Sequence, residues 1–226
     1  MRAHTGGFKP SHVEPGFERL YERCREYTMT TPERMYALYR AIGYIVSNEV
    51  PGAIVECGVW RGGSCMMAAL RLEELGEQRD IYMFDTFRGM TSPTSEDGDD
   101  AERQWREAER ESHNEWCYAS RDEVQRNMLQ VAPHERLHLV EGMVEETLPA
   151  AAPESIALLR LDTDWYESTR HELDHLYPRL SQRGVLILDD YGHWQGMRQA
   201  VDEYFGERMP LLTRIDRGAR IAVKVD

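Results

Sequence analysis

The chain has 226 residues, of which 41% are hydrophobic, 9% aromatic and 30% charged, enough apolar material for one sizeable core and too much for a disordered chain. Its 27 basic and 40 acidic residues give a net charge of −13, which would repel a phosphate backbone and argues against a nucleic-acid partner. No apolar run approaches the roughly 20 residues that span a bilayer, and the first ten residues lack a secretory-type hydrophobic stretch. We expect a single cytoplasmic domain, residues 1–226, with no membrane partner.

The first part of the chain, residues 1–50, is predicted to form N-terminal helices. Thr31 followed by Pro32 is typical of an N-cap and a first helical position, and apolar residues recur at helical spacing from Met35 to Val46. An earlier helix is expected over 14–27. Two helices should therefore precede the first strand.

From residue 53 onward, short apolar runs alternate with helical stretches. The runs are apolar on both faces, as buried parallel strands are, and lie at 53–57, 81–84, 137–140, 156–161 and 185–188. Near the end, two strand-like runs flank Asp216-Arg217-Gly218, a tight-turn sequence. This order predicts a doubly wound α/β sheet, mostly parallel, that ends in an antiparallel hairpin.

Residues 91–120 interrupt the alternation. The segment is acidic and carries Trp105 and Trp116, at a place where a strand end needs a cover. We predict a partly helical lid insertion, the alternative being a solvated surface excursion.

The first two strand ends carry residues suited to a nucleoside cofactor. Glycines after the first strand let the backbone approach a ligand and open a helix whose free amides favour polar groups. The spacing is not GxGxxG, because Val59 and Trp60 follow Gly58, so a pyrophosphate dinucleotide is disfavoured. Asp85, at the second strand end, could accept hydrogen bonds from ribose hydroxyls, a role found in both nicotinamide and adenosylmethionine enzymes.

Two later strand ends are rich in carboxylates: Asp162 and Asp164 after one, Asp189 and Asp190 after the other. Four such groups on adjacent strands repel one another unless a cation lies between them, and an oxygen-only set favours magnesium, calcium or manganese. Successive strand residues point to opposite faces, so the adjacent pair can share an ion only if the chain turns there. Asp164 also has an alternative role, as the N-cap of a capping box with Glu167.

Several stretches together resemble the macrocin O-methyltransferase family, the TylF/MycF and NovP-like methyltransferases that modify sugars in antibiotic biosynthesis. The resemblance covers most of the chain from Tyr27 to Phe205. It rests on YTMTTPERMYAL, VECGVWRGGS, MFDTFRGM, SRDEVQRNM, EGMVEETLP, LRLDTDWYEST and LDDYGHWQGMRQAVDEYF.

The resemblance implies a class I, Rossmann-like methyltransferase fold, S-adenosylmethionine and Mg²⁺. Carried over by position, the residues expected at the cofactor are Glu56, Gly58, Gly62, Gly63, Ser64, Asp85, Thr86, Gly142 and Met143. The metal ligands would be Asp162, Asp189 and Asp190, with Asp164 as the general base. His193 is a candidate substrate contact, metal ligand or plain loop residue.

We therefore expect an enzyme that methylates a hydroxyl of a metal-chelating diol, on a deoxysugar of a glycosylated natural product. The same ion geometry would serve a catechol or another phenolic diol, which is the main alternative. A cofactor-binding protein without turnover and a nicotinamide oxidoreductase are further alternatives. The acceptor should be a small-molecule glycoside or diol, and we expect a homo-oligomer, dimer or tetramer.

Overall fold

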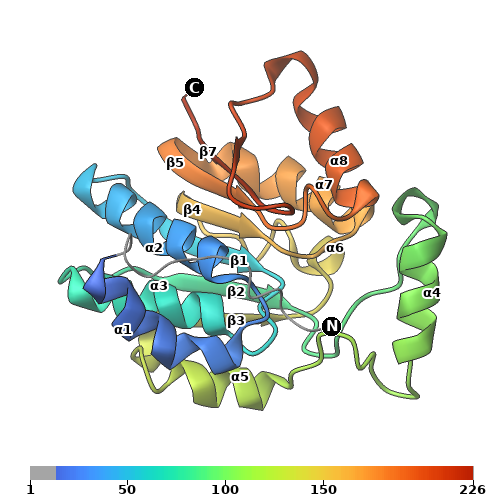
Figure 1. The fold of residues 1–226 in the computed structure, drawn as a ribbon, viewed down its shortest axis with the longest axis horizontal. Helices are drawn as coiled ribbons and strands as arrows, with labels where there is room; N and C mark the ends of the chain where they lie inside the picture. The colour runs from blue at the N-terminus through green and yellow to red at the C-terminus, as the bar shows by residue number, and fades with distance from the viewer. Residues whose placement is uncertain (1–13, 226) are drawn as a thin grey trace.

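The computed structural model describes residues 14–225, and a mixed sheet of seven strands forms the centre of this part of the chain (Figure 1). The strand order is β3-β2-β1-β4-β5-β7-β6. The first five strands pair in parallel, whereas β7 runs antiparallel to both β5 and β6. The strands are β1 (Ala53–Cys57), β2 (Ile81–Asp85), β3 (Leu137–Glu141), β4 (Ile156–Leu161), β5 (Leu180–Leu188), β6 (Thr213–Arg214) and β7 (Arg220–Val223). The predicted doubly wound sheet with a terminal hairpin is confirmed.

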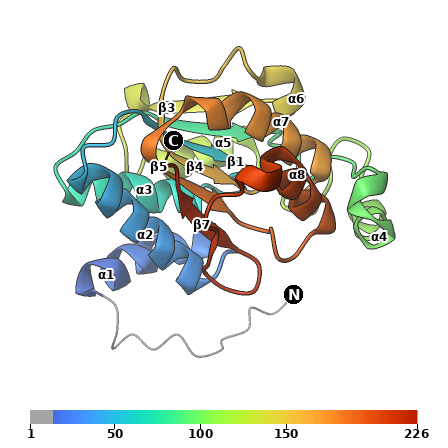
Figure 2. The ribbon, with the colours of Figure 1, turned by 90° about the horizontal axis from the view of Figure 1, so that it is seen from above.

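Helices cover both faces of the sheet, as Figures 1 and 2 show. One layer contains α1 (Pro15–Cys24), α2 (Pro32–Ser47), α3 (Gly63–Glu74) and α5 (Arg121–Met128). The other contains α6 (Val144–Thr147), α7 (Tyr166–Leu176) and α8 (Gln195–Phe205). The helix α4 (Asp99–Ala108) stands away from both layers at one side of the molecule.

Two apolar cores follow from the alternation of strand side chains. Ile54 and Met83 pack with α1, α2 and α3, whereas their neighbours Val55 and Phe84 pack toward α7 and α8. Both faces of the central strands are thus buried, which explains why these strands are continuous apolar runs in the sequence.

Element boundaries match the predictions closely, with β5 as the main exception. Thr31 is the N-cap of α2, and its Oγ1 accepts a hydrogen bond from the Arg34 amide at 3.2 Å. The strand β5 begins at Leu180 rather than at residue 185, although Gln182 and Arg183 are exposed. Backbone pairing recruits these polar residues, because the Arg183 amide donates to the Lys224 carbonyl at 2.7 Å.

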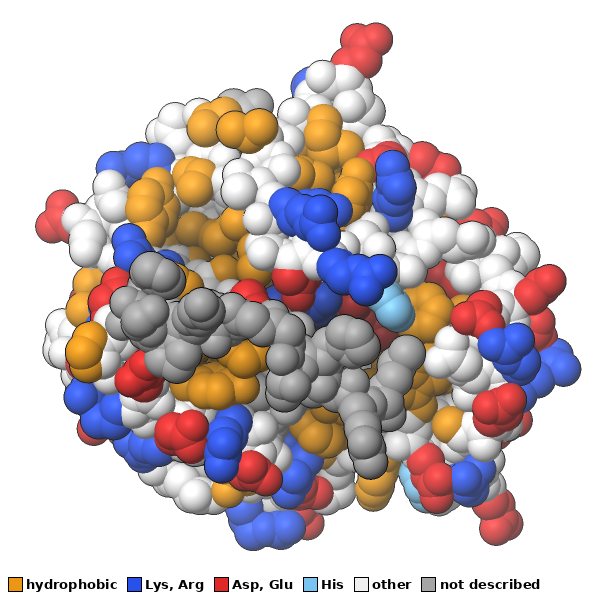
Figure 3. Space-filling model, in the orientation of Figure 1, with side chains coloured by type: hydrophobic (Ala, Val, Ile, Leu, Met, Phe, Trp, Pro, Cys, Tyr) orange, Lys and Arg blue, Asp and Glu red, His pale blue; other side chains and the backbone are white. Residues whose placement is uncertain are grey.

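The surface mixes charges of both signs. Figure 3 shows acidic and basic side chains interspersed around one face, with hydrophobic side chains between them. Within residues 14–225, no helix has both the length and the apolar character needed to cross a membrane.

The end of β1 touches the backbone that follows β4. Gly58 has φ 81°, and a Cβ there would lie 2.1 Å from the Asp162 carbonyl oxygen. The Gly58 amide also donates to the Phe84 carbonyl at 2.8 Å. Only glycine allows this approach, which brings three strand ends together.

We therefore expect Gly58→Ala to destabilise the protein more than Gly76→Ala. Gly76 also has a positive φ, 68°, but a Cβ there meets nothing within 4 Å. A left-handed alanine costs about 1–2 kcal/mol, or roughly 2–8 °C in Tm for a chain of this size. Gly58→Ala should lower Tm by clearly more, measured by calorimetry or circular dichroism. Equal losses in the two variants would show that the contact with Asp162 is not tight.

Candidate active site

The carboxyl ends of β1, β2, β4 and β5 meet at one edge of the sheet and carry most of the predicted site residues. Because β1 lies between β2 and β4, and β5 lies beyond β4, the loops after these strands are neighbours. In open α/β sheets this edge is where ligands bind.

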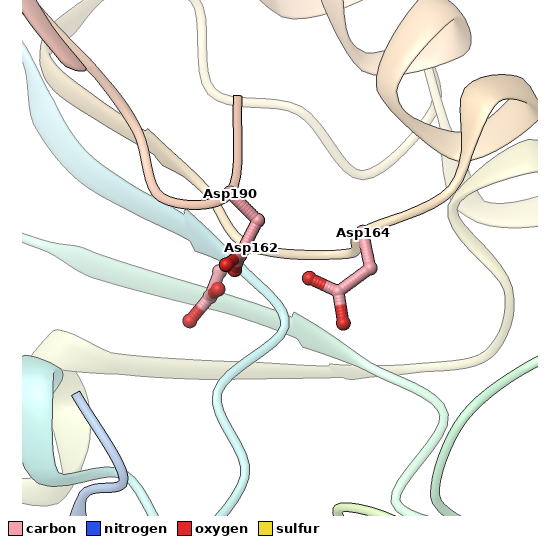
Figure 4. Close-up of side chains that lie close together, drawn as sticks. All are labelled: Asp162, Asp164 and Asp190. Atoms are coloured by element: carbon pink, nitrogen blue, oxygen red, sulfur yellow. The ribbon is translucent and has the colours of Figure 1, made fainter. Parts of the chain in front are cut away.

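Three carboxylates gather at this edge (Figure 4). Asp162 and Asp164 follow β4 and Asp190 follows β5, and one oxygen of each lies within 4.8 Å of the others. Asp164 is 8% exposed, and the other two are half-buried. We call these residues the carboxylate cluster. Oxygen donors of this kind are the preferred ligands of hard divalent cations.

The cluster carries more negative charge than its surroundings accommodate. Burial raises the pKa of Asp162 well above its usual value, the Arg160 guanidinium opposes this shift, and neighbouring carboxylates add to it. Burial also raises the pKa of Asp164 strongly, and Asp190 raises it further. A divalent cation would offset both effects. The residues present therefore fit a metal site.

Asp189, predicted as a metal ligand, lies beside the cluster and is held by two arginines. Its carboxylate is 2% exposed and forms ion pairs with Arg160 Nη2 at 2.7 Å and with Arg34 Nη1 at 2.5 Å. Asp190 belongs to the cluster and lies 3.6 Å from the same Arg34 Nη1, whereas no oxygen of Asp189 is among the cluster atoms. Ligation by Asp189 stays a prediction.

Asp164 does not cap a helix, so the capping-box alternative is wrong. The N-cap of α7 is Trp165, and the amide of Tyr166 donates to Asp97 Oδ1 at 2.7 Å. Asp164 itself has φ 69°, a left-handed conformation that turns its side chain to the cluster. Such backbone is uncommon outside glycine, although aspartate tolerates it, and it often marks a functional position.

The glycine-rich turn after β1 is fixed by Asp85. Its Oδ2 accepts hydrogen bonds from the amides of Val59 at 2.8 Å and Trp60 at 3.2 Å, and its Oδ1 accepts one from Phe87 at 2.8 Å. Gly62, with φ 89°, is then the N-cap of α3. Asp85 thus orders the turn.

Glu56 forms part of a buried ion-pair group. It lies opposite Arg160 in the register of β1 and β4, and its carboxylate pairs with that arginine and accepts from the Cys65 thiol at 2.7 Å. Burial raises the pKa of Glu56, and the Arg160 guanidinium lowers it. Arg160 also forms an ion pair with Asp162 Oδ2 at 2.8 Å, so it joins Glu56 to the carboxylate cluster.

The other predicted site residues lie around the same edge. Thr86 supports the turn after β2, since its Oγ1 donates to the Gly89 carbonyl at 2.7 Å. Met143, after β3, is 39% exposed, and His193 is exposed beside Trp194. Gly63 and Ser64 are buried in the first turn of α3, and Gly142 has φ 138°. Their contacts with a cofactor or an acceptor remain predictions.

The segment 91–120 is tied to the body at both ends. It contains η3 (Ser95–Asp97) and α4, and the Trp165 Nε1 donates to the Thr91 carbonyl at 2.9 Å. Trp116, Trp165 and Trp194 pack together with ring centroids 5.3–5.7 Å apart. Trp165 of this aromatic group follows Asp164 directly in sequence. The amide of Trp194 donates a hydrogen bond to the Asp190 carbonyl at 3.0 Å.

Sequence reasoning missed Arg34, Arg160 and Asp97. A charged residue inside the apolar run IALLRL is a signal, because a fully buried arginine needs partners. The other two had no local signal: Arg34 is on a helix distant in sequence, and Asp97 stands in an acidic segment that suggests solvent exposure.

The cluster predicts that Asp164→Asn stabilises the metal-free protein increasingly as pH rises. The pKa of Asp164 is raised in the folded state, because the fold favours the protonated carboxyl. The stability of the wild type is therefore full below about pH 4, the pKa of an unfolded aspartate. It is lost as pH rises through the folded pKa and the buried carboxyl ionises. Asparagine does not titrate and tolerates a positive φ. In chelator, the Tm of the variant should gain on the wild type between pH 5 and pH 8.

Each tenfold change in proton affinity is worth about 1.4 kcal/mol, or roughly 3–5 °C in Tm. Asp99→Asn, which removes an exposed carboxylate, is the matched control. A Tm difference that does not grow with pH, or grows equally in the control, would contradict the prediction.

Comparison with known proteins identifies relatives of this chain. The family model for macrocin-O-methyltransferase (TylF) matches residues 22–219. The demethyldecarbamoylnovobiocin O-methyltransferase of Streptomyces niveus is 35% identical over 181 residues, which are 79% of this chain and 67% of the relative. The 8-demethyl-8-(2,3-dimethoxy-alpha-L-rhamnosyl)-tetracenomycin-C 4'-O-methyltransferase of Streptomyces olivaceus is 34% identical over 182 residues, 80% of this chain and 68% of the relative.

Structural comparison agrees with the sequence matches. The solved structure of the O-methyltransferase NovP superposes with a TM-score of 0.80 at 30% identity, covering 88% of this chain and 83% of that one. The resemblance noted in the sequence is therefore confirmed. The chain belongs to the macrocin-O-methyltransferase (TylF) family.

Proposed function

We propose that the protein is an S-adenosylmethionine- and divalent-metal-dependent O-methyltransferase that methylates one hydroxyl of a diol on a sugar of a glycosylated natural product. The observation that carries this proposal is the carboxylate cluster beside the glycine-rich turn, in a chain of this family. One of its relatives is named for an acceptor that bears a rhamnosyl group. Magnesium is the cation we expect, because it prefers oxygen ligands and retains open positions.

The cofactor would lie over the ends of β1, β2 and β3. The turn from Gly58 to Ser64 presents backbone amides at the start of α3, where the polar methionine end of the cofactor would bind. Asp85 fixes that turn and would also accept a hydrogen bond from a ribose hydroxyl. Met143 is exposed at the end of β3 and would contact the adenine.

The acceptor would lie over the ends of β4 and β5, at the cluster. Asp162 and Asp190 would hold the cation, with Asp189 as a further ligand. When bound, the cation supplies the Lewis acidity that makes a coordinated hydroxyl easier to deprotonate. Asp164 lies within the same 4.8 Å group, so its carboxylate can reach the proton of a hydroxyl held there. Trp116 and Trp194, both half-buried near Asp164, would exclude water from one side of the acceptor.

We expect methyl transfer to require an added divalent cation. Purified protein, incubated with S-adenosylmethionine and Mg²⁺, should methylate members of a diol-bearing glycoside panel by mass spectrometry. Chelator should abolish the product and Mg²⁺ should restore it. A parallel panel of catechols tests the phenolic alternative: products there and none among glycosides would refute the sugar assignment. Undiminished turnover in rigorously metal-free protein would refute the metal.

The second functional prediction concerns Asp164 as the base. Asp164→Asn should lower the rate of methyl transfer by about 10²–10⁴-fold, the usual contribution of general-base catalysis. Binding of S-adenosylhomocysteine, measured by calorimetry, should be unchanged, because the cofactor residues lie on other strand ends. Near-normal turnover at saturating acceptor, under conditions where chemistry limits the rate, would show that another group removes the proton.

A further inference from the structure

One arginine of α2 is shared by three carboxylates at the site edge. The Arg34 Nε lies 2.8 Å from Asp216 Oδ2, and its Nη1 lies 2.5 Å from Asp189 Oδ2 and 3.6 Å from Asp190 Oδ1. The side chain is only 14% exposed. It connects the N-terminal helix layer, the turn between β6 and β7, and the loop after β5.

The guanidinium is held in this position by structure on two sides. Asp216 accepts hydrogen bonds from Thr31 Oγ1 at 3.1 Å and from the amides of Gly218 at 2.9 Å and Ala219 at 2.8 Å. A Cβ at Gly218 would lie 2.2 Å from Arg34 Nη2, so the guanidinium would have to shift if this residue carried a side chain. The Arg34 side chain is therefore held at the site edge by fixed contacts.

Two of the three carboxylates that Arg34 contacts, Asp189 and Asp190, are expected metal ligands. Both oxygens of Asp189 form ion pairs, Oδ1 with Arg160 and Oδ2 with Arg34. Asp190 belongs to the carboxylate cluster and lies against the same Nη1. A cation in the cluster and the Arg34 guanidinium would thus both be attracted to the Asp190 carboxylate and would repel each other.

We propose that Arg34 is an internal counter-cation that competes with the divalent metal for Asp189 and Asp190, stabilising the metal-free fold and weakening metal binding. The inference rests on the proposed metal dependence. It makes Arg34 a positioning residue: it fixes Asp189 and Asp190 in place before a metal arrives, and it keeps the metal exchangeable by opposing its charge.

The test compares Mn²⁺ binding in the wild type, Arg34→Met and Arg34→Lys, without cofactor or acceptor. Free Mn²⁺ is measured by electron paramagnetic resonance, and Tm is recorded in chelator and in Mn²⁺. Arg34→Met should bind Mn²⁺ about tenfold more tightly or better, because a nearby positive charge is gone, yet melt at a lower temperature in chelator. Arg34→Lys keeps the charge but loses the forked contacts, so its Mn²⁺ affinity should stay near the wild-type value while its Tm falls.

Arg71→Met is the matched control. Arg71 is 18% exposed and pairs with Glu74, so its loss changes net charge and removes a half-buried ion pair outside the site. Its Mn²⁺ affinity should equal that of the wild type. This separates the local effect of Arg34 from a general effect of net charge.

The outcomes are distinct. Arg34→Met binding Mn²⁺ no more tightly than the wild type overturns the inference and leaves the metal proposal standing. A wild type that binds no Mn²⁺ contradicts the proposed function itself. If Arg34→Met does not fold in chelator, added Mn²⁺ must restore its melting transition, since the cation replaces the missing charge. Failure of Mn²⁺ to do so also overturns the inference.

Discussion

Buried negative charge at the carboxyl edge of the sheet is the constraint on which this structure depends. Carboxylates from β1, β4, β5 and the β6–β7 turn converge there, and within the described residues Arg34 and Arg160 are the cations that pair with them. Taking such charges out of water is costly unless they are paired. The two arginines offset part of that cost, and the raised pKa values of Asp162 and Asp164 show that part of it remains.

This charge balance also organises the chain. Arg34 brings the N-terminal helix layer to the sheet edge, and Asp216 brings the C-terminal hairpin to the same point. Two glycines allow close contacts here. Gly58 packs against the backbone of Asp162, which follows β4, and Gly218 packs against the Arg34 guanidinium. Removing one partner from such a group leaves an uncompensated buried charge, which typically costs about 3–5 kcal/mol. Helix α2 and the β6–β7 turn are therefore coupled to the site through electrostatics as well as through packing.

The buried carboxylates of this edge lower the stability of the metal-free fold. Under the proposed metal dependence, the arginines stabilise the metal-free cluster and oppose the charge of a bound cation. Asp164 is buried and in a left-handed conformation, and Asp190 raises its pKa further. Functional sites commonly carry such local penalties, which the rest of the fold outweighs.

The sequence by itself determined the sheet, the strand ends and the family. Apolar runs buried on both faces and Thr31-Pro32 at a helix start are local signals, and local physics decides them. It did not determine which carboxylates meet. The local pattern is also compatible with a capping box at Asp164, yet Asp97 from a distant segment accepts the helix amide instead. Asp189 and Asp190 are adjacent in the chain and both lie near Arg34, but only Asp190 has an oxygen in the carboxylate cluster. Only the tertiary structure places Arg34, more than a hundred residues away in sequence, between them, because an ion pair depends on distance in space and leaves no periodic trace along the chain.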